Sequence, residues 1–111
     1  MSTSQPVVVT AYFYPAPGAR DTVLAALEKA IPRVHEEEGC NLYCIQEAPD
    51  GSFVMIEHWD SAELLDIHGD GAPVADLNAE LEGSLASPIA VTRLNPIPVG
   101  EKRKGQVRAD G

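Results

Sequence analysis

Residues 56–71, IEHWDSAELLDIHGDG, contain the single tryptophan of the chain, Trp59, and two of its three histidines, His58 and His68. A carboxyl side chain, Glu57, stands two residues before the tryptophan. Carboxyl and imidazole groups transfer protons, and an indole offers a flat apolar surface to an aromatic ligand. The residue types therefore fit a site that binds a flat ring and moves a proton, provided that the fold brings these side chains together.

Residues 52–59, SFVMIEHW, predict a β-strand, because they are rich in β-branched and aromatic side chains and follow the turn residues PDG. Side chains alternate across a strand, so Glu57 and Trp59 share one face and His58 lies on the other. If the first face is buried, Glu57 must be hydrogen-bonded or have a raised pKa, and such carboxyls often mark functional sites. The alternative is that Glu57, near the end of the strand, reaches solvent or caps a neighbouring backbone group. The first face carries Phe53, Met55, Glu57 and Trp59.

Residues 61–68 predict a short helix that begins after Asp60, which resembles a capping residue because Glu63 follows it three positions later. His68 lies four residues after Leu64, on the side of the helix expected to be buried. Taken alone, this spacing favours ordinary core packing for the histidine, and the same holds for the tryptophan. The positions of His68 and Trp59 in the sequence therefore do not predict a functional site by themselves.

The rest of the pattern predicts one α+β domain. Apolar residues repeat at helical spacing from about residue 19 to 37, and Pro32 is expected to kink this helix or shorten its regular part. A short Asp-Gly turn joins two of the strands into an antiparallel hairpin. The order β-α-β-β-α-β is the ferredoxin-like plan, with its second helix in two pieces. The predicted strands are 5–15, 40–48, 52–59 and 87–97, and the predicted helices are 19–37, 61–68 and about 72–82.

The domain is predicted to span residues 1–98, and residues 99–111 are predicted to form a polar, disordered tail, since EKRKGQVRAD has no apolar period. A chain of 111 residues suits one compact domain. Its net charge of −9 repels phosphate backbones and argues against nucleic acid as a partner. No stretch has the roughly 20 apolar residues of a membrane span, and the start, MSTSQPVVV, lacks the pattern of a signal peptide. A cytoplasmic protein with no membrane partner is expected.

The two cysteines, Cys40 and Cys44, are predicted to be buried free thiols. Four positions apart in a strand, they should point to one face about 13 Å apart, which is beyond the reach of a disulfide. They have no neighbouring Cys or His at the spacing of a zinc site. No metal site is predicted.

Both faces of the predicted sheet are apolar, although the helices of this plan cover only one of them. The strands at 5–15 and 52–59 carry apolar side chains at consecutive positions. The uncovered face must be buried by something else, and the same face of a second copy is the simplest partner. The sequence therefore predicts a homodimer whose sheets pack face to face.

Three stretches, EEEGCNLYCIQ, FVMIEHWDSAELLDIH and IAVTRLNPI, together resemble the antibiotic biosynthesis monooxygenase (ABM) family, of the dimeric α+β barrel type. The resemblance covers roughly residues 6–98. Its specific parts are the Glu-Gly-Cys step at 38–40, the Glu57-x-Trp59 pair, and His68 nine residues after the tryptophan. It implies a ferredoxin-like dimer with a pocket between sheet and helices. It also implies oxygenation of polycyclic phenols or quinols by dioxygen, with no metal or flavin cofactor.

The resemblance implies a catalytic group of Glu57, Trp59 and His68, with Phe53 and Met55 binding the ring of a small aromatic substrate. Either Glu57 or His68 would accept the substrate proton or hold a water molecule, and both assignments stay open. An aromatic enol or hydroquinone that loses a proton can pass one electron to dioxygen, and the two radicals then recombine. The protein need only bind the ring, favour its anion and exclude water.

One position departs from the family pattern. Oxygenases of this family carry an asparagine four residues before the tryptophan, where this chain has Met55, which cannot usefully hydrogen-bond a peroxide. The strand at 5–15 also lacks the asparagine of the related haem-degrading members, which argues against haem breakdown. The alternative function is a non-catalytic dimeric module that binds a small aromatic metabolite. A third, purely structural dimerisation domain would have a filled core beside Trp59.

Overall fold

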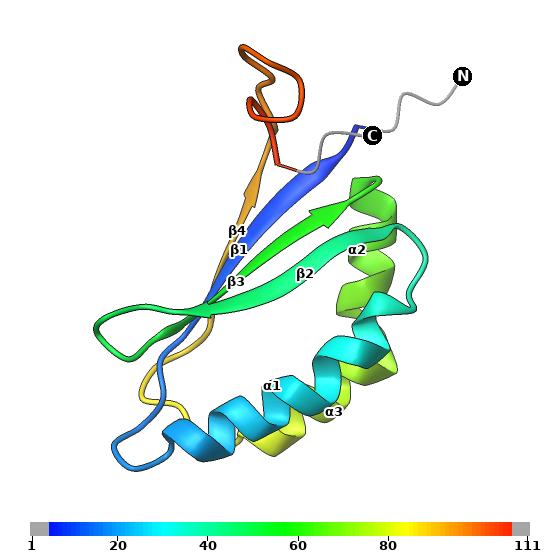
Figure 1. The fold of residues 1–111 in the computed structure, drawn as a ribbon. Coiled ribbons are helices and arrows are strands. Elements are labelled where there is room, and N and C mark those ends of the chain that lie inside the picture. Colours follow the sequence, from blue (N-terminus) through cyan, green and yellow to red (C-terminus); the bar gives the residue numbers. More distant parts are fainter. Residues whose placement is uncertain (1–4, 108–111) are drawn as a thin grey trace.

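The computed structural model describes residues 5–107 and confirms the ferredoxin-like α+β fold. Residues 1–4 of the predicted domain and 108–111 of the predicted tail lie outside the described residues. The four strands form one antiparallel sheet in the order β2-β3-β1-β4, and the helices cover one of its faces (Figure 1). The elements are β1 (Val7–Phe13), α1 (Arg20–His35), β2 (Cys40–Glu47), β3 (Phe53–Trp59), α2 (Ala62–Gly69), α3 (Ala72–Leu81) and β4 (Ala90–Leu94).

Helix α1 buries one apolar stripe and ends earlier than the periodicity predicts. Val23, Leu27 and Val34 lie on the buried stripe and are fully shielded from solvent. Pro32 lies inside the helix, which continues for only three further residues to His35. Proline removes a backbone donor and crowds the preceding turn, so a position close to the C-terminal end costs the helix least. The regular helix is therefore shorter than the predicted 19–37.

The cap of helix α2 is Ser61, and the predicted capping role of Asp60 is wrong. The Ser61 hydroxyl accepts a hydrogen bond from the backbone N–H of Leu64 at 3.2 Å, and its backbone is extended, as a cap requires. The Asp60 carboxylate instead accepts a hydrogen bond from the Asn41 side chain at 2.7 Å. Both Asp60 and Ser61 have side chains that can cap a helix. Because the Asp60 carboxylate is bound by Asn41 of β2, Ser61 caps α2.

The two cysteines are free thiols, as predicted, but they are partly exposed rather than buried, and they do not point to one face of the sheet. The register shifts between Cys40 and Leu42, so Cys40 pairs with Trp59 while Cys44 pairs with Ile56. A bulge inserts one extra residue and reverses the alternation beyond it, which places Cys40 against the core. Burial, followed by the nearby negative charges of Glu57 and Glu37, raises the pKa of the Cys40 thiol to about 11. At neutral pH this thiol is therefore protonated and unreactive.

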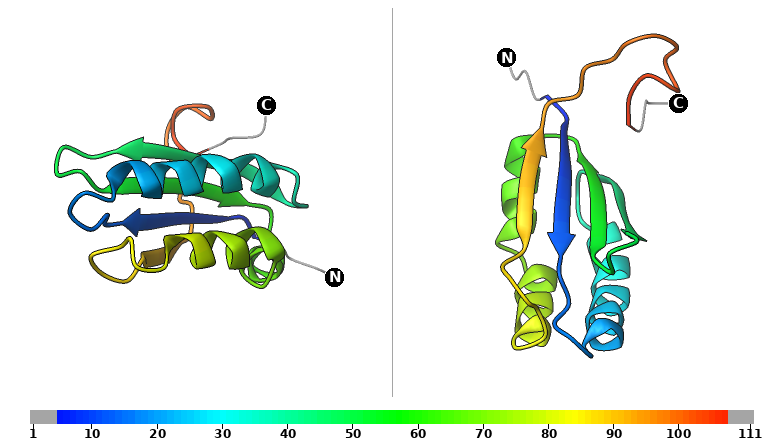
Figure 2. Two further views of the ribbon diagram at one scale, coloured as in Figure 1. Left: turned by 90° about the horizontal axis from the view of Figure 1, so that it is seen from below. Right: turned by 90° about the vertical axis from the view of Figure 1, so that its left-hand side faces the viewer.

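The opposite face of the sheet is not covered by any element among residues 5–107. Figure 2 (right) looks onto this face, and the helices lie behind it. Most side chains that alternate onto it are only partly shielded, although Val8 and His58 at one end of this face are buried. We call this surface the open face, and its central members are Thr10, Tyr12, Leu42, Cys44, Val54 and Ile56.

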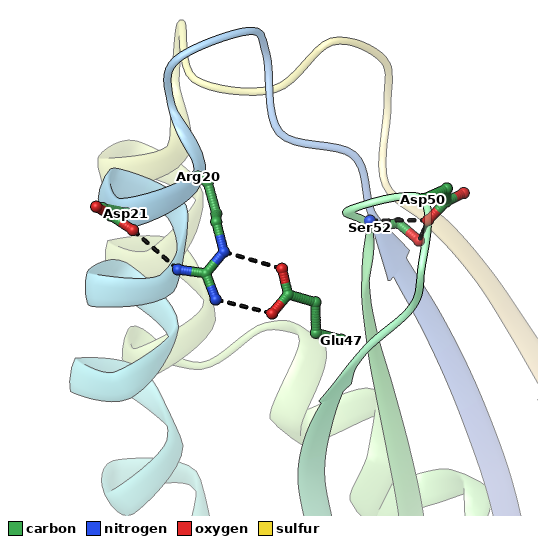
Figure 3. A network of polar contacts seen from close by, with 5 residues as sticks. All are labelled: Arg20, Asp21, Glu47, Asp50 and Ser52. Carbon is green, nitrogen blue, oxygen red and sulfur yellow. Dashed lines mark hydrogen bonds and ion pairs between the residues drawn. The ribbon is translucent and has the colours of Figure 1, made fainter.

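A polar network joins helix α1 to strand β2 at the end of the sheet remote from Trp59 (Figure 3). The Arg20 guanidinium donates two hydrogen bonds to the Glu47 carboxylate, at 2.8 and 2.9 Å, and a third to Asp21. The bidentate contact holds the pKa of Glu47 below its usual value. Arg20 also lies 5.5 Å from the centre of the Phe53 ring. This network fixes the start of α1 over the turn between β2 and β3.

Residues 99–107 of the predicted tail form turns that project beyond the end of β4 (Figure 1). The Glu101 carboxylate accepts hydrogen bonds from the backbone N–H groups of Arg103 and Lys104. The boundary at residue 98 and the disorder of the tail stay predictions. In the described part of the chain, every helix is too short or too polar to cross a membrane.

Candidate active site

A cavity of about 270 Å³ lies between the sheet and helices α2 and α3. Its floor is apolar, with Val9, Ala11 and Phe13 from β1. Glu57 enters it from β3 and His68 from α2, so these two predicted site residues line one cavity. This combination of an apolar hollow with few converging polar groups is typical of a small-molecule site. It also argues against the purely structural alternative, which required a filled core.

The Glu57 carboxyl group is buried and hydrogen-bonded to the tryptophan. Its residue is only 5% exposed, and the Trp59 Nε1–H donates to Glu57 Oε1 at 2.9 Å. Burial raises the pKa of Glu57 above its ordinary value, and the hydrogen bond from Trp59 and the nearby His68 oppose this rise. The contact explains why a carboxyl group is tolerated among apolar side chains. The alternative that Glu57 reaches bulk solvent is wrong.

The imidazole of His68 is held between two aromatic rings and a second carboxylate. Its ring centre lies 4.5 Å from that of Trp59, and the two planes are tilted by 33°. Tyr43 approaches from another side, 5.5 Å away and almost perpendicular. His68 Nδ1 lies 2.7 Å from Glu37 Oε1. The side chain is therefore fixed in both position and orientation.

The structure brings together three of the five predicted site residues. Glu57 and His68 line the cavity, and Trp59, fully buried, lies behind them in contact with both. Met55 is also fully buried and lies in the core without lining the cavity. Phe53 stands six residues before Trp59, a strand distance of about 20 Å, under Arg20. The substrate-binding roles of Phe53 and Met55 stay predictions.

Sequence reasoning missed three polar residues that line the cavity. Tyr43 lies on β2 opposite Glu57, Asn78 lies on α3, and Arg93 lies on β4. Alternation could have placed Tyr43, because it pairs directly with Glu57 in the register. Burial, and then the charges of Glu57 and Glu37, raise the pKa of the Tyr43 phenol, so it is neutral at ordinary pH. The exposed positions of Asn78 and Arg93 mark the side on which the cavity opens.

Among residues 5–107, no three His, Cys, Asp or Glu side chains are grouped so that they could hold a metal ion. The polar groups that line the cavity can donate and accept hydrogen bonds and, at Glu57 and His68, transfer protons. Arg93 is engaged by Asp66 of α2, with Nη2 and Oδ1 2.6 Å apart. This ion pair is about half exposed and borders the open side of the cavity.

Replacing Glu57 by glutamine is expected to stabilise the protein at neutral pH. The raised pKa means that the folded state disfavours the ionised carboxyl. The stability that Glu57 contributes is therefore fully present below its ordinary pKa of 4.5 and is lost as pH rises through the raised value. Urea unfolding of both proteins between pH 4.5 and 8 should show the wild type falling progressively below the variant.

Glu28→Gln on the exposed side of α1 is the matched control and should show no such trend. A wild type that gains stability relative to Glu57→Gln as pH rises would show that the site favours the carboxylate. In that case the protonated carboxyl would not be available as a proton donor in the cavity.

The comparisons with known proteins agree with this geometry. The family model described as "Antibiotic biosynthesis monooxygenase" matches residues 6–79. The chain belongs to this family. It is 35% identical over 95 residues to the Mycobacterium tuberculosis protein named "Putative monooxygenase Rv0793", covering 85% of this chain and 94% of that protein. The family match includes Glu57, Trp59 and His68 but ends before β4, so the family pattern does not cover Arg93.

Solved structures of similar proteins confirm the ABM fold. The structure of Rv0793 from Mycobacterium tuberculosis matches with a TM-score of 0.81 at 34% identity, over 87% of this chain and all of that chain. PA3566 from Pseudomonas aeruginosa has a TM-score of 0.79 at 21% identity, over 87% of this chain and 99% of that one. At that lower identity the likeness shows the fold alone. The ferredoxin-like arrangement is thus shared over nearly the full length of these relatives.

Proposed function

We propose that this protein is a cofactor-independent monooxygenase that oxidises a small aromatic phenol or quinol with dioxygen. The observation that carries the proposal is the apolar cavity into which a buried carboxyl and an oriented imidazole both project. Membership of the ABM family and the name of the Mycobacterium tuberculosis relative support it. The cavity, at about 270 Å³, is slightly smaller than the roughly 300–1,000 Å³ usual for ligand sites. It therefore favours substrates of one or two fused rings.

In the proposed reaction, His68 takes the phenolic proton of the substrate. The resulting anion gives one electron to dioxygen, and the superoxide and substrate radical combine to form a carbon–oxygen bond. Glu57, whose burial raises its pKa and so favours the protonated carboxyl, donates a proton to the peroxide. The Glu57 carboxylate then accepts the proton of the ring carbon that carries the peroxide, a carbonyl forms at that carbon, and the O–O bond breaks. The departing hydroxide takes the proton held by His68 and leaves as water. A quinol and dioxygen thus give a hydroxyquinone and one water, with no outside reductant.

An oxygen electrode tests this function directly. The purified protein, dialysed against a chelator, is supplied with a panel of naphthoquinols, smaller quinols and anthrones. We expect oxygen uptake above the uncatalysed rate, with one oxygen consumed for each hydroxylated quinone formed. The same turnover before and after dialysis is expected for a reaction that needs no metal. No uptake above background with any member of the panel would reject the enzyme function.

The second candidate is a dimeric module that binds a small aromatic metabolite without changing it. Met55 favours it, because this residue stands where the family's oxygenases carry an asparagine and is buried without lining the cavity. The amide that does line the cavity comes from another element, Asn78 of α3. A thermal-shift screen with the same aromatic compounds separates the two functions. Ligands that raise the melting temperature and are recovered unchanged, without oxygen uptake, would establish the binding module.

We also propose that the protein works as a homodimer in the cytoplasm, with the open faces of two sheets packed together. The apolar open face supports the dimer, and the two free thiols fit a reducing compartment. Ile56 lies near the centre of this face. In such an isologous interface each residue occurs twice, so one substitution acts on both sides.

Ile56→Asp is therefore expected to weaken self-association by about 100-fold, or roughly 2.7 kcal/mol, because each copy would bury an unpaired carboxylate. Sedimentation equilibrium over a range of protein concentrations measures this change. Ile67→Asp is the matched control, because Ile67 is 66% exposed on the helix layer. A wild type that sediments as a monomer at micromolar concentration would contradict the dimer.

A further inference from the structure

Glu37 lies in a run of three glutamates, and it is the one whose side chain turns into the protein. Glu36 and Glu38 are less enclosed, whereas the Glu37 side chain is 21% exposed and its Oε1 lies 2.7 Å from His68 Nδ1. The two residues are 31 positions apart and come from the end of α1 and the end of α2. A run of acids at a helix end is usually solvated, so the inward turn of one member needs a structural reason.

The backbone on both sides of Glu37 is fixed. Its N–H donates to the Val34 carbonyl at 2.9 Å, and its carbonyl accepts from the Cys40 N–H at 3.3 Å. Gly39 has a φ of +85°, and an added Cβ there would lie 2.5 Å from Leu64 Cδ1 on α2. Only glycine permits both this backbone conformation and this close approach. The turn is thereby pressed against α2, which brings Glu37 to His68.

The contact with Glu37 determines which nitrogen of His68 carries the proton. A carboxylate oxygen at 2.7 Å accepts a hydrogen bond, so Nδ1 must be the donor and Nε2 of the neutral ring carries the lone pair. The hydrogen bond of His68 is made by Nδ1, and Nε2 has no hydrogen-bond partner among residues 5–107. In this part of the chain, every side-chain nitrogen or oxygen that is shielded from solvent does have such a partner. Nε2 is therefore accessible, and His68 lines the cavity. The lone pair is available to a ligand bound there.

We propose that Glu37 is a positioning residue that holds His68 as a proton acceptor facing the cavity, an arrangement in which a carboxylate orients the base that takes the substrate proton. This inference rests on the proposed function for its catalytic consequence. Its physical content, the tautomer of His68 and its effect on a bound phenol, can be measured without turnover. Glu37 itself touches no substrate, since it does not line the cavity.

The first experiment is ¹⁵N NMR of the full chain labelled at its three histidines, above the pH at which they titrate. The signals are assigned by removing each histidine in turn. We expect His68 of the wild type to be the Nδ1–H form and Glu37→Ala to lose that preference. Glu38→Gln, a neighbour in the same run, should match the wild type. A wild type in the Nε2–H form would overturn the proposal.

The second experiment uses 4-nitro-1-naphthol, a bicyclic phenol whose anion is detected by its visible absorbance. At the pH where half of the free probe is ionised, we expect the wild type to bind it mainly as the anion. Glu37→Gln keeps the size of the side chain and removes its charge, and should lower the ratio of bound anion to bound phenol about tenfold. Glu38→Gln should leave the ratio unchanged. Equal ratios in the wild type, Glu37→Gln and Glu37→Ala would overturn the proposal.

If a quinol is turned over, Glu37→Gln should lower kcat roughly 10- to 100-fold and leave KM nearly unchanged, because the orientation matters for the proton transfer step. Absence of oxygen uptake together with the expected tautomer and probe ionisation would reject the monooxygenase and keep the role of Glu37. Quinol turnover with the same kcat in Glu37→Gln as in the wild type would support the monooxygenase and reject the role of Glu37. Glu37→Gln is nearly isosteric, so it decides between these outcomes if Glu37→Ala fails to fold.

Discussion

Replacing His68 by alanine is expected to lower kcat for quinol oxidation by roughly 10²- to 10⁴-fold, the usual contribution of one acid–base group. The imidazole projects into the cavity with an accessible Nε2, and Glu37 fixes its orientation. The buried Glu57 is less suited to act as this base, because burial raises its pKa and so favours the protonated carboxyl, which cannot accept a proton. Oxygen uptake under saturating quinol and air measures the loss.

The matched control for this experiment is His35→Ala. His35 is exposed at the end of α1, where its Nε2 contacts the backbone carbonyl of Tyr43, and it does not line the cavity. We expect its activity to stay close to that of the wild type. A loss below about threefold in His68→Ala, in protein shown by circular dichroism to be folded, would exclude His68 as the base.

Replacing Trp59 by alanine is expected to remove roughly 3–5 kcal/mol from the free energy of unfolding. Trp59 is fully buried and is the largest such side chain among the described residues. Its loss opens a cavity beside His68 and also leaves Glu57 Oε1 without its donor. Because the whole free energy of unfolding of a small domain is only about 5–15 kcal/mol, this loss could leave the protein barely stable. Urea unfolding followed by circular dichroism gives the value.

Ile67→Ala, at a site 66% exposed on α2, should cost less than about 0.5 kcal/mol and serves as the comparison. Trp59→Phe should cost less than Trp59→Ala, because it keeps an aromatic ring against His68 while removing the Nε1–H donor to Glu57 and part of the ring volume. A loss under about 1 kcal/mol for Trp59→Ala would show that the core relaxes around the missing ring.

The buried position of Trp59 changes how its part in the site is understood. The sequence alone suggested a ring wall in direct contact with substrate, whereas the cavity is bordered by the two groups that Trp59 supports, Glu57 and His68. The tryptophan holds the carboxyl through its N–H and the imidazole through its face. Substitutions of Trp59 will therefore alter stability and activity together, and only variants of His68 and Glu37 can separate the two.

Much of the fold could be predicted from the sequence because the signals are local. Alternation along β3 placed Glu57 and Trp59 on the helix side and His58 on the open face, as the register shows. The strands and helices lie within a few residues of their predicted bounds. The exceptions have local causes that composition does not reveal. One extra residue near Cys40 turned that side chain to the other face, and Ser61 rather than Asp60 caps α2.

The sequence by itself determined which residues share a face, because strand alternation and helical periodicity are properties of the backbone over a few residues. The tertiary structure alone decided which faces meet, and at what distance. It joined Glu37 to His68 across 31 positions, buried Met55 in the core without exposing it to the cavity, and added Tyr43, Asn78 and Arg93 to the cavity lining. Such contacts depend on the lengths of turns and on the close approach of Gly39 to α2, and no periodicity within a single element encodes them.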